Sequence, residues 1–194
     1  MLIVCTGNVC RSAFAERLAR AYLHTELGED APAIRIVSAG TRAVVDSAMH
    51  PDTALVLRGF GAEAGDFRAR QLQDVTAAEA GLVLTMTRSH RHQVLERTPR
   101  ALQRTFTLRE AADLVQLVEE EEEEGAAAGS ADAPAGLVSR IAAARSRRHS
   151  SRDDDIRDPI GQPIAVHEEV GEAIAAALLP VLRRLSDLRP GRPD

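Results

Sequence analysis

The chain has 194 residues, of which 44% are hydrophobic, and a formal net charge of −5. These values predict one domain of ordinary size with a core of its own, and they exclude a wholly disordered protein. The acidic balance disfavours nucleic acid as a partner, and no apolar run approaches the roughly 20 residues of a membrane span. We therefore expect a cytoplasmic protein with no nucleic-acid or membrane partner.

The first residues predict one βα unit. Residues 2–4 are a short apolar run typical of a buried strand, and residues 11–24 carry apolar side chains at helical spacing. Residues 5–12 then form the loop at the carboxyl end of the strand. In open α/β sheets this is where ligands bind.

The composition of this loop favours an oxyanion, most simply phosphate. Gly7 permits unusual backbone torsions and Asn8 tolerates the left-handed region, so that successive amide N–H groups can converge on one anion beside the positive end of the helix. Arg11 adds a planar fork for two phosphate oxygens. We expect the Cys5 thiol to ionise readily in this field and to act as a nucleophile.

The rest of the chain alternates strands with helices. Short strands are predicted at 34–38, 80–86 and 104–107, and helices at 51–57, 87–97, 108–118 and 165–188, the last kinked or divided at Pro180. Such alternation predicts an α/β fold with parallel strands and right-handed crossovers. His90 and His92, two positions apart on a helix, are expected to be solvated, and Arg68 and Arg70 to brace loops or lie on the surface.

Residues 119–152 differ in composition from the rest. Six glutamates, 119–124, precede a stretch rich in Gly, Ala and Ser, and the basic block 145–149 precedes the acidic block 153–155. We expect a flexible charged insertion within a single domain spanning 1–194, with a short helix opening near 137. It is alternatively a docking segment for a basic partner. The two opposed blocks either neutralise each other at the rim of the active site or recruit substrate.

Five sequence motifs together resemble one known family. They lie at residues 5–12 (CTGNVCRS), 38–41 (SAGT), 68–72 (RARQL), 84–87 (LTMT) and 158–159 (DP). The chain resembles the low-molecular-weight protein tyrosine phosphatases, a family that includes phosphoarginine phosphatases and some arsenate reductases. The resemblance covers nearly all of the chain outside about 118–152. We therefore expect a three-layer, doubly wound sheet of four parallel strands with helices on both faces and a flavodoxin-like strand order.

The resemblance implies a phosphatase that works through a phosphocysteine intermediate. Cys5 is the expected nucleophile, Arg11 the phosphate clamp and Asp158 the general acid and base, in preference to residues 153–155. The expected substrate-binding residues are the rest of the loop: Thr6, Gly7, Asn8, Val9, Cys10 and Ser12. Ser12 is also expected to donate a hydrogen bond to the Cys5 thiolate. The reaction needs no metal and no cofactor.

The substrate is expected to be a phosphorylated protein or a small phosphoester. Relatives specific for phosphotyrosine carry an apolar β-branched residue at the position of Val9, whereas phosphoarginine-specific relatives carry threonine. Against this, Ile160 follows Asp158-Pro159 where tyrosine phosphatases usually place aromatic residues, and only 3% of the chain is aromatic. Phosphotyrosine in proteins is the favoured prediction. The alternatives are a protein arginine phosphatase or small-phosphoester phosphatase, and a non-catalytic phosphate-binding module.

The chain has two cysteines, Cys5 and Cys10, too few for a disulfide scaffold and too close together for a four-ligand zinc site. Thioredoxin-linked arsenate reductases use further cysteines, so that activity is not expected. Cys10 either packs beneath the loop or captures oxidised Cys5 in a reversible disulfide. The sequence indicates no particular oligomeric state.

Overall fold

The sheet has four parallel strands in the order β2-β1-β3-β4. The structure is a computed structural model and describes residues 1–123, 125, 134–148 and 154–188. The strands are β1 (Leu2–Cys5), β2 (Val37–Gly40), β3 (Val83–Thr85) and β4 (Thr105–Thr107). Leu2 lies between Val37 on one side and Val83 on the other. The predicted parallel sheet and its flavodoxin-like order are confirmed.

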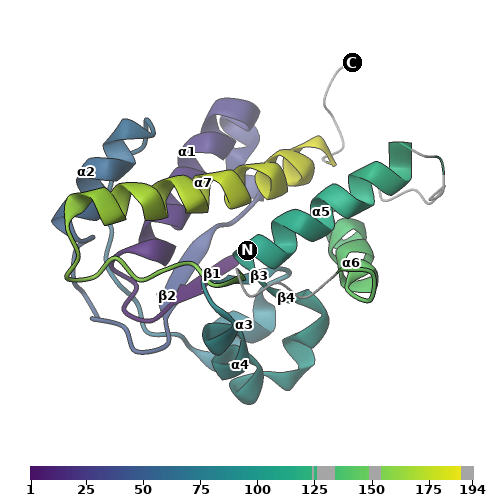
Figure 1. Ribbon diagram of the computed structural model, residues 1–194, viewed down its shortest axis with the longest axis horizontal. Helices are drawn as coiled ribbons and strands as arrows, with labels where there is room; N and C mark the ends of the chain where they lie inside the picture. Colours follow the sequence, from purple (N-terminus) through teal and green to yellow (C-terminus); the bar gives the residue numbers. More distant parts are fainter. Residues whose placement is uncertain (124, 126–133, 149–153, 189–194) are drawn as a thin grey trace.

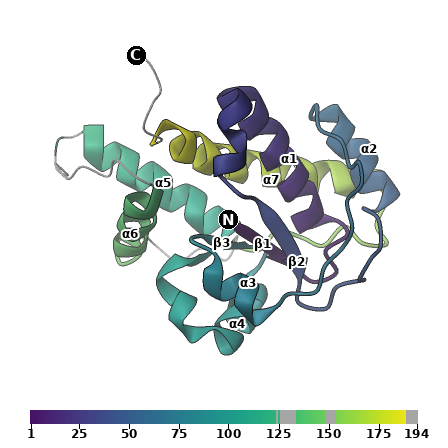
Figure 2. The same cartoon turned by 180° about the vertical axis from the view of Figure 1, so that it is seen from behind.

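Helices cover both faces of the sheet (Figures 1 and 2). The side chains of β1 alternate, so that Ile3 joins a core with one group of helices while Leu2 and Val4 join a smaller core with the other. The first group is α1 (Arg11–Leu27), α2 (Pro51–Gly59), α5 (Leu108–Glu123) and α7 (Ile164–Asp187), and the second is α3 (Asp74–Glu79) and α4 (Arg88–Arg97). The three-layer, doubly wound prediction is therefore confirmed.

Several element boundaries differ from the predicted ones. The second strand begins at Val37 rather than at 34, because β1 is four residues long and its register ends at Gly40. The helix α3 and the 3-10 helices η1 (Gly28–Ala33) and η2 (Pro99–Arg104) were not expected. Each has six residues, too short for a helical period to show in the sequence.

The C-terminal helix α7 runs through Pro180 without a break. The predicted division there is wrong, because the turns beside the proline are held by side chains that are fully buried in the main core. These are Leu178, Val181 and Leu182. Packing of an apolar face thus outweighs the missing N–H of one proline.

The charged segment 119–152 is helical over much of its described part. Glu119–Glu123 continue α5, and α6 (Pro134–Ala144) packs on α5 through buried Leu137 and Ile141. The glutamates are balanced by arginines from elsewhere in the chain, including Arg184 of α7, which pairs with Glu122 at 2.5 Å, and Arg147 in the turn after α6, which pairs with Glu121 at 2.8 Å. The flexible insertion stays a prediction, although these described residues are helical. Residues 124, 126–133 and 149–152 lie outside the described part.

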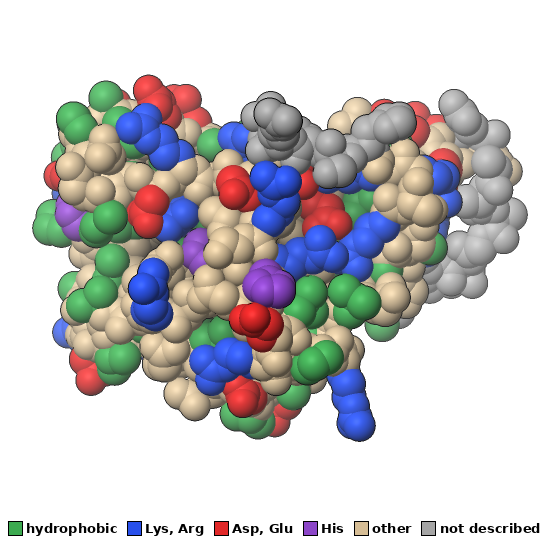
Figure 3. All heavy atoms as spheres, turned by 60° about the horizontal axis from the view of Figure 1, so that its bottom comes forward, with side chains coloured by type: hydrophobic (Ala, Val, Ile, Leu, Met, Phe, Trp, Pro, Cys, Tyr) green, Lys and Arg blue, Asp and Glu red, His purple; other side chains and the backbone are tan. Residues whose placement is uncertain are grey.

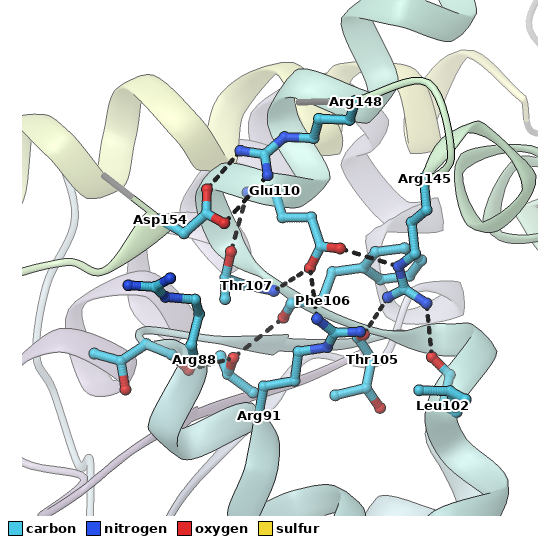
Figure 4. Close-up of polar contacts among 12 residues, drawn as sticks. Arg88, Arg91, Leu102, Thr105, Phe106, Thr107, Glu110, Arg145, Arg148 and Asp154 are labelled. Atoms are coloured by element: carbon cyan, nitrogen blue, oxygen red, sulfur yellow. Dashed lines mark hydrogen bonds and ion pairs between the residues drawn. The ribbon is translucent and has the colours of Figure 1, made fainter. Parts of the chain in front are cut away.

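The end of this segment is anchored to the edge strand β4, as Figure 4 shows. Glu110 and Thr107 exchange two hydrogen bonds of 3.1 Å at the start of α5, and Arg145 Nε donates to Glu110 at 3.0 Å while its guanidinium lies 4.0 Å from the centre of the Phe106 ring. The segment therefore covers an edge that would otherwise offer unpaired backbone groups.

A second anchor joins the two opposed charge blocks. Arg148 pairs with Asp154 at 2.5 Å and with Asp113 at 2.6 Å. Arg148 belongs to the basic block and Asp154 to the acidic one, so the described part of the segment supports the prediction that the blocks neutralise each other.

Two features relate to nucleic-acid and membrane partners, namely the distribution of surface charge and the length and polarity of the helices. On the face in Figure 3, basic and acidic side chains are interspersed, and no continuous basic area covers it. Among the described helices, none is long and apolar enough to cross a membrane.

Candidate active site

The phosphate-binding loop is shaped by pairing with the loop that follows β2. The carbonyls of Cys5, Thr6 and Gly7 accept hydrogen bonds of 2.9–3.0 Å from the N–H groups of Thr41, Arg42 and Val44. Since each peptide unit is planar and trans, the N–H groups of residues 6–8 point the opposite way, toward the interior of the loop. This is the concavity that an oxyanion requires.

Asn8 braces this loop from beneath. It adopts φ 55° and is fully buried, and its side-chain amide donates to Ser12 Oγ and to Ser38 Oγ, both at 2.8 Å. Its carbonyl oxygen accepts from the backbone N–H of Arg70 at 2.8 Å. The prediction of a left-handed residue at Asn8 is confirmed, and Gly7 is not among the positive-φ residues.

The Cys5 sulfur lies at the base of the concavity. Its Sγ is 2.9 Å from Ser12 Oγ and accepts the backbone N–H of Asn8 at 3.3 Å. Cys5 is 2% exposed. Two hydrogen-bonding groups, one hydroxyl and one backbone N–H, thus lie against this one sulfur.

Arg11 and Asp158 meet at the mouth of the loop. Arg11, the first residue of α1, donates from Nη2 to Asp158 Oδ2 at 2.5 Å and from Nη1 to the carbonyl of Ile156 at 3.0 Å. The Ile156 N–H in turn donates to the carbonyl of Met86, just after β3, at 2.8 Å. These contacts bring the Asp158 loop to the carboxyl edge of the sheet, where the sequence predicted that it would act.

His90 is a site residue that the sequence analysis missed. Its ring lies between Thr6 Oγ1, at 2.8 Å from Nε2, and Thr87 Oγ1, at 2.9 Å from Nδ1. Burial, and then the charge of Arg11, lower the pKa of His90 to about 4. The expectation that His90 is solvated is wrong, because Thr87 caps α4 and turns the ring inward. His92 is exposed, as expected.

A buried carboxylate supports the loop from the far side. Glu16 accepts from Ser38 Oγ at 2.5 Å and pairs with Arg70 at 2.7 Å. Ser38 also receives the Asn8 amide, so a chain of hydrogen bonds runs from α1 through β2 to the loop. The loop-bracing interpretation of Arg70 is thereby confirmed.

The sequence of the chain matches a family that carries this loop. A family model described as low molecular weight phosphotyrosine protein phosphatase matches residues 1–120. The chain belongs to this family. Its members are hydrolases of phosphate monoesters that work through a phosphocysteine intermediate.

Individual relatives carry two different substrate names. The chain is 36% identical over 110 residues to a protein-arginine-phosphatase of Geobacillus stearothermophilus, covering 57% of this chain and 69% of the relative. It is also 36% identical over 106 residues to a putative low molecular weight protein-tyrosine-phosphatase of Klebsiella pneumoniae, covering 55% and 68%. Among solved structures, the Geobacillus stearothermophilus arginine phosphatase YwlE superposes with a TM-score of 0.65 at 26% identity, covering 96% of this chain and 92% of that one.

The family match ends before the Asp158 loop, which we also call the acid loop. It stops at residue 120, so it includes Cys5 and Arg11 but not Asp158. Asp158 joins the site through its contact with Arg11 and through the hydrogen bond from the Ile160 N–H to Asp158 Oδ1 at 3.3 Å. Both cysteines are free thiols in this structure, and the Cys5–Cys10 disulfide stays a prediction.

The rim of this phosphatase site is aliphatic. Val44, in the loop after β2, is 54% exposed, and Ile160, in the Asp158 loop, is 49% exposed. An added Cβ at Gly7 would lie 3.5 Å from Val9 and 3.7 Å from Val44, so these side chains lie together over the loop. The two rim loops offer apolar surface without an aromatic ring.

Proposed function

We propose that this family member hydrolyses phosphotyrosine in proteins, with Cys5 as nucleophile, Arg11 as phosphate clamp and Asp158 as general acid and base. The observation that carries the proposal is the convergence of the Cys5 sulfur, held by Ser12 and Asn8, with the Arg11–Asp158 pair at one loop. A module that only binds phosphate has no need for a hydrogen-bonded sulfur beneath the anion.

In the first step the Cys5 thiolate attacks phosphorus and the bond from phosphorus to the tyrosine oxygen breaks. Asp158 gives its proton to the departing phenolate. Arg11 and the N–H groups of residues 6–12 hold the three non-bridging oxygens as charge spreads over them. Thr6, Gly7, Val9 and Cys10 contribute to this step through their backbone.

In the second step a water molecule attacks the phosphocysteine and the phosphorus–sulfur bond breaks. Asp158, now ionised, accepts the proton of the water, and inorganic phosphate leaves. Ser12, 2.9 Å from the sulfur, stabilises the departing Cys5 thiolate by donating its hydroxyl hydrogen. Asp158 gives up one proton in the first step and takes up one in the second, so the two steps need no other acid or base.

The substrate assignment is supported by the rim. Val9, Val44 and Ile160 cannot hydrogen-bond a guanidinium group, whereas their apolar surface can pack on a phenyl ring. Overall sequence identity does not distinguish phosphotyrosine from phosphoarginine as the substrate, because relatives named for either one are 36% identical to the chain. A protein arginine phosphatase or a small-phosphoester phosphatase is the alternative, and a non-catalytic phosphate-binding module is the second.

A side-by-side assay tests the proposal. Wild type, Cys5→Ser and Asp158→Ala are compared on a phosphotyrosine peptide and on a protein phosphorylated on arginine. We expect turnover of the tyrosine ester that is abolished by Cys5→Ser and reduced roughly 10²–10⁴-fold by Asp158→Ala, the usual worth of a general acid. Preference for phosphoarginine would retain the mechanism and overturn the substrate. No turnover of either substrate by the reduced protein would favour the binding module.

A matched pair of variants tests the role of Val9. Val9→Thr keeps the β-branched shape and adds a hydroxyl that can orient a guanidinium, whereas Val9→Ile keeps the position apolar. We expect Val9→Thr to shift kcat/KM toward phosphoarginine and Val9→Ile to leave the ratio unchanged. Equal ratios in the two variants would show that the Val9 side chain does not set the substrate preference.

A further inference from the structure

Behind the phosphate loop lies a second cluster of reactive side chains. Cys10 precedes α1, His50 precedes α2, and His167 lies in the first turn of α7. The Cys10 sulfur and one ring nitrogen from each histidine lie within 4.8 Å of one another. Neither histidine belongs to the phosphatase site described above, and Cys10 enters that site only through its backbone.

The fold holds these three residues in place by separate contacts. The backbone N–H of His50 donates to the carbonyl of Val9 at 2.8 Å, and the two imidazole rings stack with centres 4.9 Å apart at 22°. His167 Nδ1 lies 2.8 Å from Thr53 Oγ1 on α2. The His167 ring is therefore oriented by a partner outside the cluster, as is usual for histidines that bind metals.

One ring nitrogen of each histidine lacks a hydrogen-bond partner. His167 Nε2 and His50 Nδ1 are buried atoms without one, and His167 is only 3% exposed. An unpaired polar nitrogen in a protein interior is costly and calls for a specific explanation. Asp52 Oδ2, 3.9 Å from His50 Nδ1, is the nearest ion-pair partner and adds negative charge beside the cluster.

The donor atoms of the cluster suit a cation. Neutral imidazoles are ready ligands. A thiol in such a setting gives up its proton when a cation takes the proton's place.

We propose that Cys10, His50 and His167 form a zinc site at the base of the phosphate loop. One thiolate sulfur and two imidazole nitrogens are the donors that Zn²⁺ prefers. Bond lengths of about 2.0–2.3 Å in a tetrahedral site place ligand atoms about 3.3–3.7 Å apart, so small rotations of these side chains complete the geometry. Binding forms one Zn–S and two Zn–N bonds and releases the Cys10 proton to solvent, and water takes the fourth position.

Zinc bound at this site would cross-link the starts of α1, α2 and α7. It joins the residue before Arg11 to the start of α2 and to the first turn of α7, all of which meet under the loop. Occupation therefore raises the melting temperature by mass action. It also removes the Cys10 sulfur from reaction with an oxidised Cys5.

Metal binding tests the proposal directly. Chelator-treated, reduced protein is titrated with Zn²⁺ against a competing chromophoric chelator, and with Co²⁺ as a spectroscopic probe. We expect one equivalent of either metal, a thiolate-to-cobalt charge-transfer band and the visible bands of tetrahedral cobalt. Cys10→Ser and His167→Ala should each weaken Zn²⁺ binding by more than the roughly 10–100-fold that an outer partner costs. His92→Ala, on the exposed side of α4, should bind as the wild type does.

The active-site cysteine provides the decisive control. Cys5→Ser should retain the charge-transfer band and the affinity, which also separates this result from phosphatase activity because that variant lacks the nucleophile. Loss of binding in Cys5→Ser, or unchanged binding in both Cys10→Ser and His167→Ala, would overturn the site. If His167→Ala unfolds by circular dichroism, His50→Ala, at a partly exposed position, takes its place with the same expected loss.

Discussion

Arg11 Nη2 donates a hydrogen bond of 2.5 Å to Asp158 Oδ2, which joins the phosphate clamp to the proposed general acid. The Arg11 side chain is 5% exposed and that of Asp158 is 44% exposed. A phosphoryl group bound by the loop needs the same guanidinium edge, so it competes with the carboxylate. Displaced from Arg11, Asp158 is free to face the leaving oxygen at the mouth of the site.

Asp158→Asn separates the competition of Asp158 with phosphate for Arg11 from its role as general acid. Because Asn removes both the competing carboxylate and its charge, we expect inorganic phosphate to bind about 3–10-fold more tightly, in line with about 1 kcal/mol for a partly exposed ion pair. The value of kcat should fall roughly 10²–10⁴-fold. Isothermal titration and steady-state assays measure the two quantities. Asp155→Asn, which removes a charge from the same loop where Asp155 accepts from the Arg88 N–H, is the matched control and should leave phosphate affinity nearly unchanged.

Ser12→Ala should slow the second chemical step more than the first. The change removes the hydroxyl 2.9 Å from the Cys5 sulfur, so the thiolate becomes a poorer leaving group when water attacks the phosphocysteine. With a chromogenic phosphate monoester we expect a clear initial burst followed by a slower steady state than in the wild type. A lower kcat without accumulation of phosphocysteine would contradict the role given to Ser12.

The same variant should also destabilise the fold. Ser12 Oγ accepts the Asn8 amide at 2.8 Å, and its removal takes one partner from a fully buried group. We expect a loss of about 1–3 kcal/mol in the free energy of unfolding. Ser139→Ala, on the exposed face of α6, should change that free energy by no more than about 0.5 kcal/mol, the usual effect at a surface site.

The parts of the site that are local in sequence could be predicted from it. The end of β1, the left-handed Asn8 and the start of α1 follow one another, so spacing alone indicated an anion-binding loop around Cys5 and Arg11. The contact between Arg11 and Asp158 could be predicted only through the family resemblance. Nothing in the intervening residues indicates that the two meet.

The missed residues depend on partners that are distant in the chain. His90 is buried because Thr6 and Thr87 bind its two ring nitrogens, and a lone histidine on a polar helix shows neither contact. The run of glutamates that follows Val118 suggested self-repulsion. The sequence does not show that arginines of α6 and α7 pair with this run in the folded chain. Single-sequence patterns describe an element and its faces but not which charges meet across elements.

Buried His90 predicts a pH dependence of stability. Its pKa in the folded protein is about 4, below the ordinary value near 6.5, so the unfolded chain takes up the proton first as the pH falls. This contribution is therefore fully present above about pH 6.5 and is lost progressively toward pH 4. We expect urea unfolding to show a loss of roughly 2 kcal/mol between pH 7.5 and 5.

A pair of histidine variants isolates this contribution. His90→Gln should make the free energy of unfolding less dependent on pH over this interval, whereas His92→Gln, at a side chain that is 75% exposed on the same helix, should keep the wild-type slope. An unchanged slope in His90→Gln would assign the acid sensitivity to other groups.

The ion pair between Arg148 and Asp154 holds the start of the Asp158 loop. The side chains of Arg148 and Asp154 are 9% and 8% exposed and 2.5 Å apart, and this hydrogen bond raises the pKa of Arg148. Arg148→Ala leaves the Asp154 carboxylate buried without its main partner, so we expect a loss of about 3–5 kcal/mol in the free energy of unfolding. Arg147→Ala, which removes a half-exposed arginine paired with Glu121, should cost no more than about 1 kcal/mol.

Replacing both members of the pair distinguishes an unpaired charge from lost packing. In Arg148→Met/Asp154→Leu no charge is left buried, and apolar groups fill a similar volume, so stability should recover most of the loss seen in Arg148→Ala. Because Asp154 lies four residues before Asp158, Arg148→Ala should also lower kcat while leaving KM nearly unchanged, as expected of a positioning residue. If Arg148→Ala costs no more stability than Arg147→Ala, the acid loop is held by the Ile156 contacts instead.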